Sequence, residues 1–265
     1  MSHRDREIGS SHPLVVRRLP TAARDHATIR RTWRLFRAFP LEQSRPELFY
    51  GTLAQDSVAQ IGAFADLAGA TILDVGGGPG YFADAFAAAG ARYVAADVDA
   101  GEMRLHGRSP GALTVLGSGM ELPFRTGSLD VTYSSNVAEH VAQPWRMADE
   151  MVRVTRPGGL VALSYTLWFG PWGGHETSPW HLLGGVRAAD RYARRTGHRP
   201  KNDFGDSMFA VTASAGLRWA RSTGRAELVA AVPRYLPWWM APLVHLPGVR
   251  EILMWNLLLV LRVRP

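Results

Sequence analysis

The stretch 71–81, TILDVGGGPGY, constrains the fold more strongly than any other part of the chain. Its first half is a short apolar run typical of a buried parallel strand. Its second half is a glycine turn that leads into a predicted helix over 82–89. The glycines let the backbone turn tightly and leave no side chain between the main chain and a ligand. Because amide groups at the start of the helix point at that ligand, the stretch predicts a strand–turn–helix unit that binds a cofactor.

Two classes of ligand compete for this turn. A dinucleotide fold uses G-x-G-x-x-G, in which two residues separate the second glycine from the third. Here those two residues are missing, and Pro79 also removes an amide that a phosphate could use. Asp74 is the one charge in the strand, and it suits a ligand with a cationic end. The form D-x-G-x-G-x-G over 74–80 resembles the loop of class I S-adenosylmethionine methyltransferases.

Composition sets further bounds. A length of 265 residues is enough for one large domain, and the absence of cysteine excludes disulfides and thiolate metal sites. Neither an apolar signal region nor an apolar stretch long enough to span a bilayer is found, so we expect a cytoplasmic protein. The net charge of +7 favours anionic partners, namely nucleic acid, acidic glycans or an anionic membrane face.

The segment before the glycine turn reads as a flexible tail over 1–20 followed by a helical cap over 21–68, with helices at 21–39 and 52–68. The first helix carries an apolar stripe beside a basic stripe, which a membrane-seeking helix and an ordinary cap helix with a solvated arginine face both explain. These stripes are Ile29, Trp33 and Phe36, and Arg30, Arg34 and Arg37. Tyr50 fits a lid over the cofactor and equally fits simple core packing.

Beyond the turn, apolar runs alternate with helical segments. The predicted strands are 91–97, 112–116, 129–133, 160–165, 225–232 and 252–263, and the predicted helices are 145–155, 182–201 and 211–223. This alternation predicts a parallel sheet covered by helices on both faces. Asp97 ends the second strand 23 positions after Asp74, close to the spacing of a ribose-binding acid. Asp99 is its rival, and we prefer Asp97 because it stands where the apolar run stops.

Five motifs in order resemble the class I methyltransferases and, over the whole chain, a little-characterised actinobacterial group of them. They are DVGGGPG (74–80), AADVD (95–99), GSGMELPF (117–124), SLDVTYSSNVAEHV (128–141) and RVTRPGG (153–159). The resemblance implies a Rossmann-like, doubly wound, mostly parallel seven-stranded sheet whose last strand is antiparallel. It also implies a single domain over 21–265, with a cofactor-binding half over 69–166, a lid insertion over 167–210 and a C-terminal part over 211–265.

The same resemblance implies S-adenosylmethionine as the cofactor, with S-adenosylhomocysteine as its product. The residues that it assigns to cofactor binding are Tyr50, Asp74, Gly76, Gly77, Gly78, Tyr81, Asp97, Val98, Ser118, Gly119, Met120, Ser135 and Asn136. Among these, Asp74 and the glycine backbone would hold the methionine end, and Asp97 the ribose. Ser118 departs from the family, in which many members have aspartate at that position.

The segment after the fifth strand, 166–181, is rich in glycine and tryptophan and carries two histidines. Because ligands of open α/β sheets bind outside the carboxyl ends of the strands, this segment is expected to form the wall of the substrate site. Transfer of a methyl group to an alcohol requires loss of the hydroxyl proton, which a histidine can accept. The candidates are His140 and His175, with His181 third and with Glu176 as the group that orients His175. Alternatively, His140 and His175 are structural or only contact the substrate. A set of His175, Glu176 and His181 could instead ligate a metal, but its spacing is not diagnostic, and no metal is predicted.

We therefore expect an S-adenosylmethionine-dependent O-methyltransferase that acts on a hydroxyl of a glycan, a glycolipid or an apolar metabolite. Methylation of carbon or nitrogen in a natural product is the alternative within the same class. The net charge also suggests RNA as a possible substrate of methylation. However, no RNA-binding module is found, and nucleic acid is not an expected partner. The apolar stretch 235–245 could line a substrate pocket, rest at the inner face of a membrane or, as is more common, simply pack beneath the lid. The oligomeric state is left open.

Overall fold

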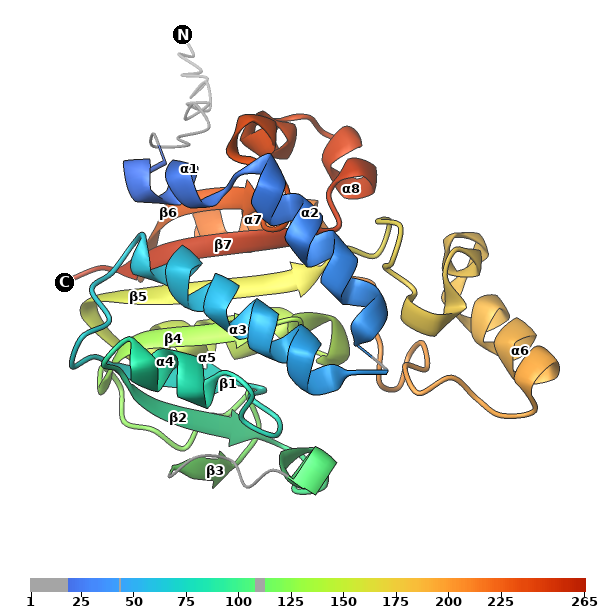
Figure 1. Ribbon diagram of the computed structural model, residues 1–265, viewed down its shortest axis with the longest axis horizontal. Helices are drawn as coiled ribbons and strands as arrows, with labels where there is room; N and C mark the ends of the chain where they lie inside the picture. Colours follow the sequence, from blue (N-terminus) through green and yellow to red (C-terminus); the bar gives the residue numbers. More distant parts are fainter. Residues whose placement is uncertain (1–18, 43, 108–112) are drawn as a thin grey trace, which may run out of the picture.

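A seven-stranded sheet in the order β3-β2-β1-β4-β5-β7-β6 forms the centre of the molecule (Figure 1). This computed structural model describes residues 19–42, 44–107 and 113–265, so the predicted tail over 1–20 lies almost wholly outside the described residues. The strands are β1 (Thr71–Val75), β2 (Arg92–Asp97), β3 (Thr114–Leu116), β4 (Leu129–Ser135), β5 (Thr155–Thr166), β6 (Ala226–Pro233) and β7 (Asn256–Val263). The first five strands are parallel, and β7 runs antiparallel to both β5 and β6. The predicted fold class is confirmed.

Helices cover both faces of the sheet, which gives three layers (Figure 1). The helices are α1 (Thr21–His26), α2 (Ile29–Ala38), α3 (Pro46–Gly62), α4 (Ala83–Ala88), α5 (Pro144–Val154), α6 (Gly185–Thr196), α7 (Ala213–Ser222) and α8 (Val249–Leu253). Short 3-10 turns lie at η1 (Phe39–Leu41), η2 (Glu102–Gly107), η3 (Ala138–His140), η4 (His175–Thr177), η5 (Trp180–Leu183) and η6 (Trp238–His245). Among the described residues, no helix combines the length and apolarity needed to cross a membrane.

Each face of the sheet has its own hydrophobic core, because successive side chains of a strand point to opposite faces. In β1, Ile72 packs with α3 and α4, whereas Leu73 and Val75 pack with α5 and α7. Burial on both faces explains why the central strands read as continuous apolar runs. Because helices cover both faces of the sheet, a ligand-binding site is expected at the carboxyl ends of the parallel strands.

Several predicted boundaries shift in the structure. The helix expected over 21–39 is broken into α1 and α2, because Thr28 leaves the helical conformation and its side chain caps the amide of Arg31. The helix expected over 52–68 is α3, which begins at Pro46, where proline suits a first turn. The strand expected from 252 starts at Asn256, because α8 occupies the preceding residues. The turn expected at 156–159 is part of β5, where the pairing with β4 shifts register.

The direction in which successive strands are added to the sheet reverses at its centre. The chain moves outward from β1 through β2 to β3 and then returns to the other side of β1 as β4. At such a switch point the loops from neighbouring strands leave in opposite directions and open a crevice. The glycine turn after β1 and the Ser135–Asn136 segment after β4 thus follow the two neighbouring strands at this switch point.

Candidate active site

The glycine turn between β1 and α4 has positive φ, which favours glycine, at Gly76, Gly78 and Gly80. Gly76 has φ +78°, and a Cβ there would lie 2.4 Å from the side chain of Val137. A Cβ on Gly77 would lie 3.0 Å from Ala95, so this residue is also close-packed. Gly78 has φ +48°, and nothing lies within 4 Å of the place where its Cβ would be. Gly78 therefore borders open space, as the resemblance requires of a loop that lies against S-adenosylmethionine.

Asp74 lies beneath this turn and not in open solvent. Its side chain is 2% exposed, and its Oδ2 accepts a hydrogen bond from the Tyr93 hydroxyl at 2.6 Å. Burial raises the pKa of Asp74 to about 7; the Tyr93 hydrogen bond opposes this shift, and the charge of Asp97 adds to it. A cation placed above the turn would favour the ionised form of this carboxylate.

Asp97 links the end of β2 to the glycine turn. Its Oδ2 accepts from the Gly78 amide at 2.9 Å, and its Oδ1 accepts from the Asp99 amide at 3.0 Å. The carboxylate of Asp99 instead accepts from its own turn, at the Gly101 amide. Of the two rivals, Asp97 is thus the one that contacts the glycine turn, while Val98 between them is 72% exposed.

The segment expected around the adenine follows β3 and lies against the same strand ends. The Gly117 amide donates to the Asp97 carbonyl at 2.8 Å, and the Ser118 hydroxyl accepts from the Met120 amide at 3.2 Å. A Cβ on Gly119 would lie 3.1 Å from Val75, so this turn is packed closely onto β1. The three predicted adenine residues are therefore grouped beside Asp97.

Tyr50 reaches the other side of the glycine turn from α3. Its ring stacks on that of Tyr81 with centroids 4.6 Å apart, and its hydroxyl donates to Glu42 at 3.1 Å. Tyr81 directly follows the last glycine of the turn. The stacked pair closes the helical cap over the start of α4, which agrees with both readings of Tyr50.

A buried guanidinium supports the end of β4. Arg234 is 1% exposed and donates to the hydroxyls of Ser135 and Ser164, each at 2.6 Å. It also donates to Ser57 and Tyr133, so it joins α3, β4 and β5. Asn136, at φ +56°, accepts from Asn256 at 2.6 Å and donates to Tyr235 at 3.2 Å. Both predicted sulfonium neighbours thus have fixed side chains, with Ser135 held by an arginine.

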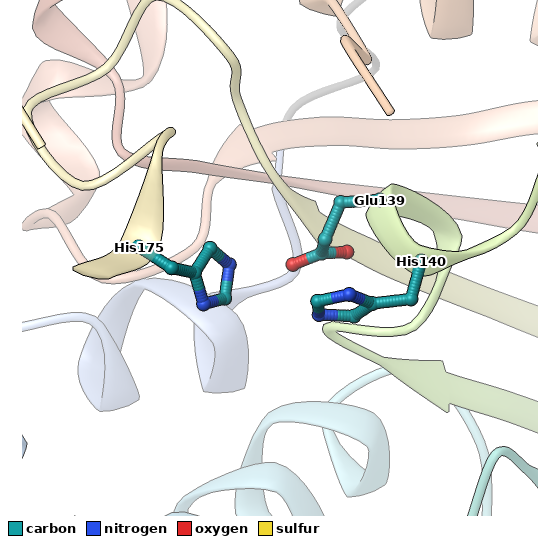
Figure 2. A group of neighbouring side chains, drawn as sticks. All are labelled: Glu139, His140 and His175. Carbon is teal, nitrogen blue, oxygen red and sulfur yellow. The ribbon is translucent and has the colours of Figure 1, made fainter. Parts of the chain in front are cut away.

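Glu139, His140 and His175 form a cluster at the carboxyl end of β4 (Figure 2). The first two lie in η3, directly after β4, and His175 lies in η4 within the expected lid. The two imidazole rings meet edge to face with centroids 5.2 Å apart. Burial lowers the pKa of His175, and the charge of Glu139 only partly offsets this effect. The cluster therefore places the His175 ring, whose neutral form burial favours, beside the side chains of Glu139 and His140.

The predicted partnership of His175 with Glu176 is not the one found. Both oxygens of Glu176 accept from Asn202, at 3.0 and 2.9 Å, and the carboxylate that joins the cluster is Glu139. His181 is buried and bonds the Trp168 carbonyl through Nε2 at 2.8 Å, which indicates a structural role. Glu176 and His181 are therefore separate from the pair of catalytic candidates, His140 and His175.

Sequence reasoning missed two residues of this region. Glu139 stands next to His140 in the printed sequence, and the Glu-His pair just after a strand end could have singled it out. Arg234 carried no such signal, because its partners come from segments up to 177 positions away. Both residues are buried and charged, a combination that requires partners and so marks a built site.

A groove of about 530 Å³ lies elsewhere, between α3 and α4. Its lining is largely alanine and small side chains, with Tyr81 at one end. Gly78 and Asp97 do not line this groove and contact each other at the ends of β1 and β2 instead.

Comparison with known proteins agrees with this site. A family profile described as "Methyltransferase domain" matches residues 73–163. An uncharacterized methyltransferase of Mycolicibacterium gilvum is 57% identical over 247 residues, which cover 89% of this chain and 95% of the relative. One of Mycobacteroides abscessus is 53% identical over 250 residues, covering 90% and 96%. A solved S-adenosylmethionine-dependent methyltransferase of Mesorhizobium loti shares the fold, with TM-score 0.54 and 19% identity over 80% of this chain and 97% of that one.

The match to the profile spans the glycine turn, Asp97, the adenine segment and the Glu139–His140 pair. The predicted cofactor, S-adenosylmethionine, agrees with the family and with the fold. Since the similarity to the mycobacterial relatives extends over nearly their whole length, the chain belongs to this family of methyltransferases.

Proposed function

We propose that the protein transfers the methyl group of S-adenosylmethionine to a hydroxyl group, with His140 and His175 assisting the loss of the hydroxyl proton. The observation that carries this proposal is the cluster of Glu139, His140 and His175 beside the segment that follows β4. An amine can attack as a free base, whereas an alcohol must lose its proton during transfer. A cluster rich in lone pairs at the methyl-facing end of the site therefore favours oxygen as the acceptor atom.

The cofactor supplies an activated methyl group when it is bound. The acceptor oxygen would bond to the methyl carbon as the carbon–sulfur bond breaks with its electron pair on sulfur, and the hydroxyl proton would pass to the ring of His175 or His140. The glycine turn, Asp97 and the adenine segment would hold the cofactor, and the cap and lid would exclude water. Alignment of the two reacting groups would supply most of the rate.

Aromatic side chains next to the cluster support a sugar or an apolar acceptor. The Trp172 carbonyl accepts from the His175 amide at 3.0 Å, and the Trp172 ring lies 4.5 Å from that of Trp255. Phe36 of α2 contacts both rings. Such flat apolar surfaces bind sugar rings and acyl chains, so we infer that the acceptor hydroxyl belongs to a glycan, a glycolipid or an apolar metabolite.

The same face supports contact with an anionic membrane. Ile29 and Trp33 of α2 are 53% and 59% exposed, and the exposed Arg30, Arg34 and Arg37 lie on the same helix. The Trp238 amide of η6 donates to the Ala27 carbonyl, which brings the exposed Trp238 and Trp239 beside α2. Exposed tryptophan next to arginine is typical of surfaces that rest on lipid head groups. We infer that the enzyme reaches a lipid-linked acceptor at the membrane surface.

Transfer of labelled methyl groups tests the proposed chemistry. The purified enzyme is incubated with methyl-labelled S-adenosylmethionine and with lipid and glycan extracts of a mycobacterium, and the labelled product is characterised by mass spectrometry and NMR. We expect a methyl ether. A label attached to nitrogen or carbon would refute the proposal.

Variants test the role of the cluster. His175→Ala and His140→Ala should lower kcat by about 10²-fold or more while S-adenosylhomocysteine still binds with unchanged affinity. The matched control is His198→Ala, because His198 is exposed and its ring contacts the Arg199 carbonyl and the Tyr192 ring rather than the cluster. Full activity in both cluster variants would remove the histidines from the mechanism.

A further inference from the structure

Glu139, His140 and His175 converge from two segments of the chain, and one ligand atom from each lies within 4.8 Å of the others (Figure 2). We propose that these three side chains bind a divalent transition-metal cation, which in turn binds the acceptor hydroxyl. The role of the cation in methylation rests on the proposed function, whereas its binding does not. The sequence alone assigned no metal ligands, because one of the three lies 35 positions beyond the other two.

The carboxylate is the first argument. Glu139 is 1% exposed, yet its Oε2 has no hydrogen-bond partner among the described residues. Its Oε1 accepts only the Thr166 amide, at 3.0 Å. A buried carboxylate is costly unless it is paired or coordinates a metal. The Nε2 of His175 is likewise buried without a partner, so the cluster contains two buried polar atoms that a cation would satisfy.

The surroundings of the ligands are the second argument. His140 Nδ1 lies 2.8 Å from the Ser207 carbonyl oxygen. Because a carbonyl can only accept, Nδ1 carries the proton and Nε2 keeps its lone pair. A metal-binding histidine usually donates its other nitrogen to a carbonyl or a carboxylate, and a metal-binding carboxylate is itself hydrogen-bonded. His140 and Glu139 both follow this pattern, through Ser207 and Thr166.

The donor set indicates the class of ion. Two imidazole nitrogens and one carboxylate oxygen suit Mn²⁺, Fe²⁺ or Zn²⁺ better than Mg²⁺, which prefers oxygen alone. Metal–ligand bonds of about 2.1 Å put ligand atoms about 3.0–3.5 Å apart. Atoms that lie within 4.8 Å of one another would have to draw together by at most about 2 Å when the ion binds, which small rotations of the side chains achieve.

Three protein ligands leave coordination positions open, as in catalytic metal sites. An acceptor with two neighbouring oxygens, such as a vicinal diol of a sugar, would fill two of them. Binding to the cation lowers the pKa of a hydroxyl group, so its proton can pass to water. The oxygen lone pair then forms the bond to the methyl carbon, the sulfur keeps the electron pair of the broken bond, and the cation is unchanged.

Metal binding is tested first, without any methyl transfer. The full-length protein is stripped with a chelator and titrated with MnCl₂, ZnCl₂ and MgCl₂ by calorimetry, and metal-dependent changes in Tm are recorded. We expect one equivalent of Mn²⁺ or Zn²⁺ to bind and to raise Tm, since a ligand that binds only the folded state stabilises it. Mg²⁺ should bind at least tenfold more weakly. If none of the three ions binds stoichiometrically, the proposal is overturned.

Matched variants then locate the ion. Glu139→Gln, which preserves size, and His175→Ala should each weaken Mn²⁺ binding at least tenfold, whereas Glu47→Gln and His198→Ala should leave it unchanged. Circular dichroism and Tm without metal show whether each variant folds. The wild-type titration and His175→Ala keep the test valid if Glu139→Gln does not fold. Equal binding by the cluster variants and the controls would place the ion elsewhere and refute the site.

Methyl transfer separates this inference from the proposed function. A chelator should abolish formation of the methyl ether, and Mn²⁺ should restore it. If the stripped enzyme forms the methyl ether at full rate, the cation has no role in methyl transfer. The proposed function would then stand, with the histidines acting as bases. Stoichiometric metal binding together with a product methylated on nitrogen or carbon would refute the proposed function while leaving the metal site intact.

Discussion

A single buried carboxylate, Asp74, should make cofactor binding depend on pH. Burial raises its pKa to about 7, so in the free protein it is largely protonated below neutrality. A cationic ligand above the turn favours the charged form, and binding at low pH must therefore release a proton. The affinity for S-adenosylhomocysteine should consequently rise by roughly twentyfold between about pH 5.5 and pH 7.5, as expected for one group with a pKa of about 7.

Calorimetry in two buffers of different ionisation enthalpy measures both the affinity and the proton release. Asp74→Asn should bind more weakly at neutral pH and lose most of the pH dependence. Asp66→Asn is the control, because Asp66 is exposed and caps only the Ala68 amide. The same rise in affinity for wild type and Asp74→Asn would assign the titration to another group.

At the scale of single residues, the sequence predicted the roles of those residues whose conformation is set by their neighbours along the chain. The glycine turn is such a case, because positive φ at Gly76 and Gly78 follows from a local turn. Contacts between distant segments were not predictable in this way. Glu176 looked like the partner of His175 because it is adjacent in sequence, but the fold brings Glu139 to the cluster instead.

At the scale of elements, a carboxylate of α8 holds the start of α7. Glu251 accepts from the Ala213 amide at 2.7 Å and from the Ser214 amide at 2.8 Å, and both amides lie in the first turn of α7. These amides have no partner within the helix, and a negative charge there also favours the helix dipole. The contact joins α8 to α7, which packs against β6 and β7, so it should contribute to the stability of the whole domain.

Glu251→Ala should therefore lower the free energy of unfolding by about 2 kcal/mol, in the range of charge-assisted hydrogen bonds. Urea denaturation followed by circular dichroism measures the change. Glu47→Ala, an exposed glutamate in the first turn of α3, should change it by less than about 0.5 kcal/mol. Equal effects of the two substitutions would show that Glu251 acts only as a general charge at a helix start.

The elements themselves were largely predictable, whereas their ends were not. Apolar runs located every strand of the sheet, because both faces of the central strands are buried. The ends depend on local competition that a hydrophobic pattern does not contain. Thr28 interrupts the first predicted helix by capping the second, and α8 takes residues that an apolar run had assigned to the last strand.

At the scale of the molecule, one face combines exposed aromatic residues with arginine. It runs from α2 to η6 and α8: the Trp238 amide of η6 donates to the Ala27 carbonyl just before α2, and Phe36 of α2 contacts Trp255, which follows α8. Its exposed large apolar side chains are Ile29, Trp33, Phe36, Trp238, Trp239, Val249, Ile252 and Leu253. The helix α6 lies apart from this face, although it also carries exposed arginines. The two helices thus allow the effect of position to be separated from that of net charge.

We predict that the protein binds vesicles that contain phosphatidylglycerol and binds neutral phosphatidylcholine vesicles much more weakly, as measured by flotation. Each free arginine at an anionic surface contributes about 1 kcal/mol, and Arg34 also pairs with Asp56 at 3.5 Å, so replacing Arg30, Arg34 and Arg37 by glutamine should weaken binding by at least about thirtyfold. The control replaces Arg187, Arg194 and Arg195 of α6 by glutamine, which removes the same charge from a different face. If both triple variants lose binding equally, attraction depends on net charge alone, and the α2 face does not rest on the membrane.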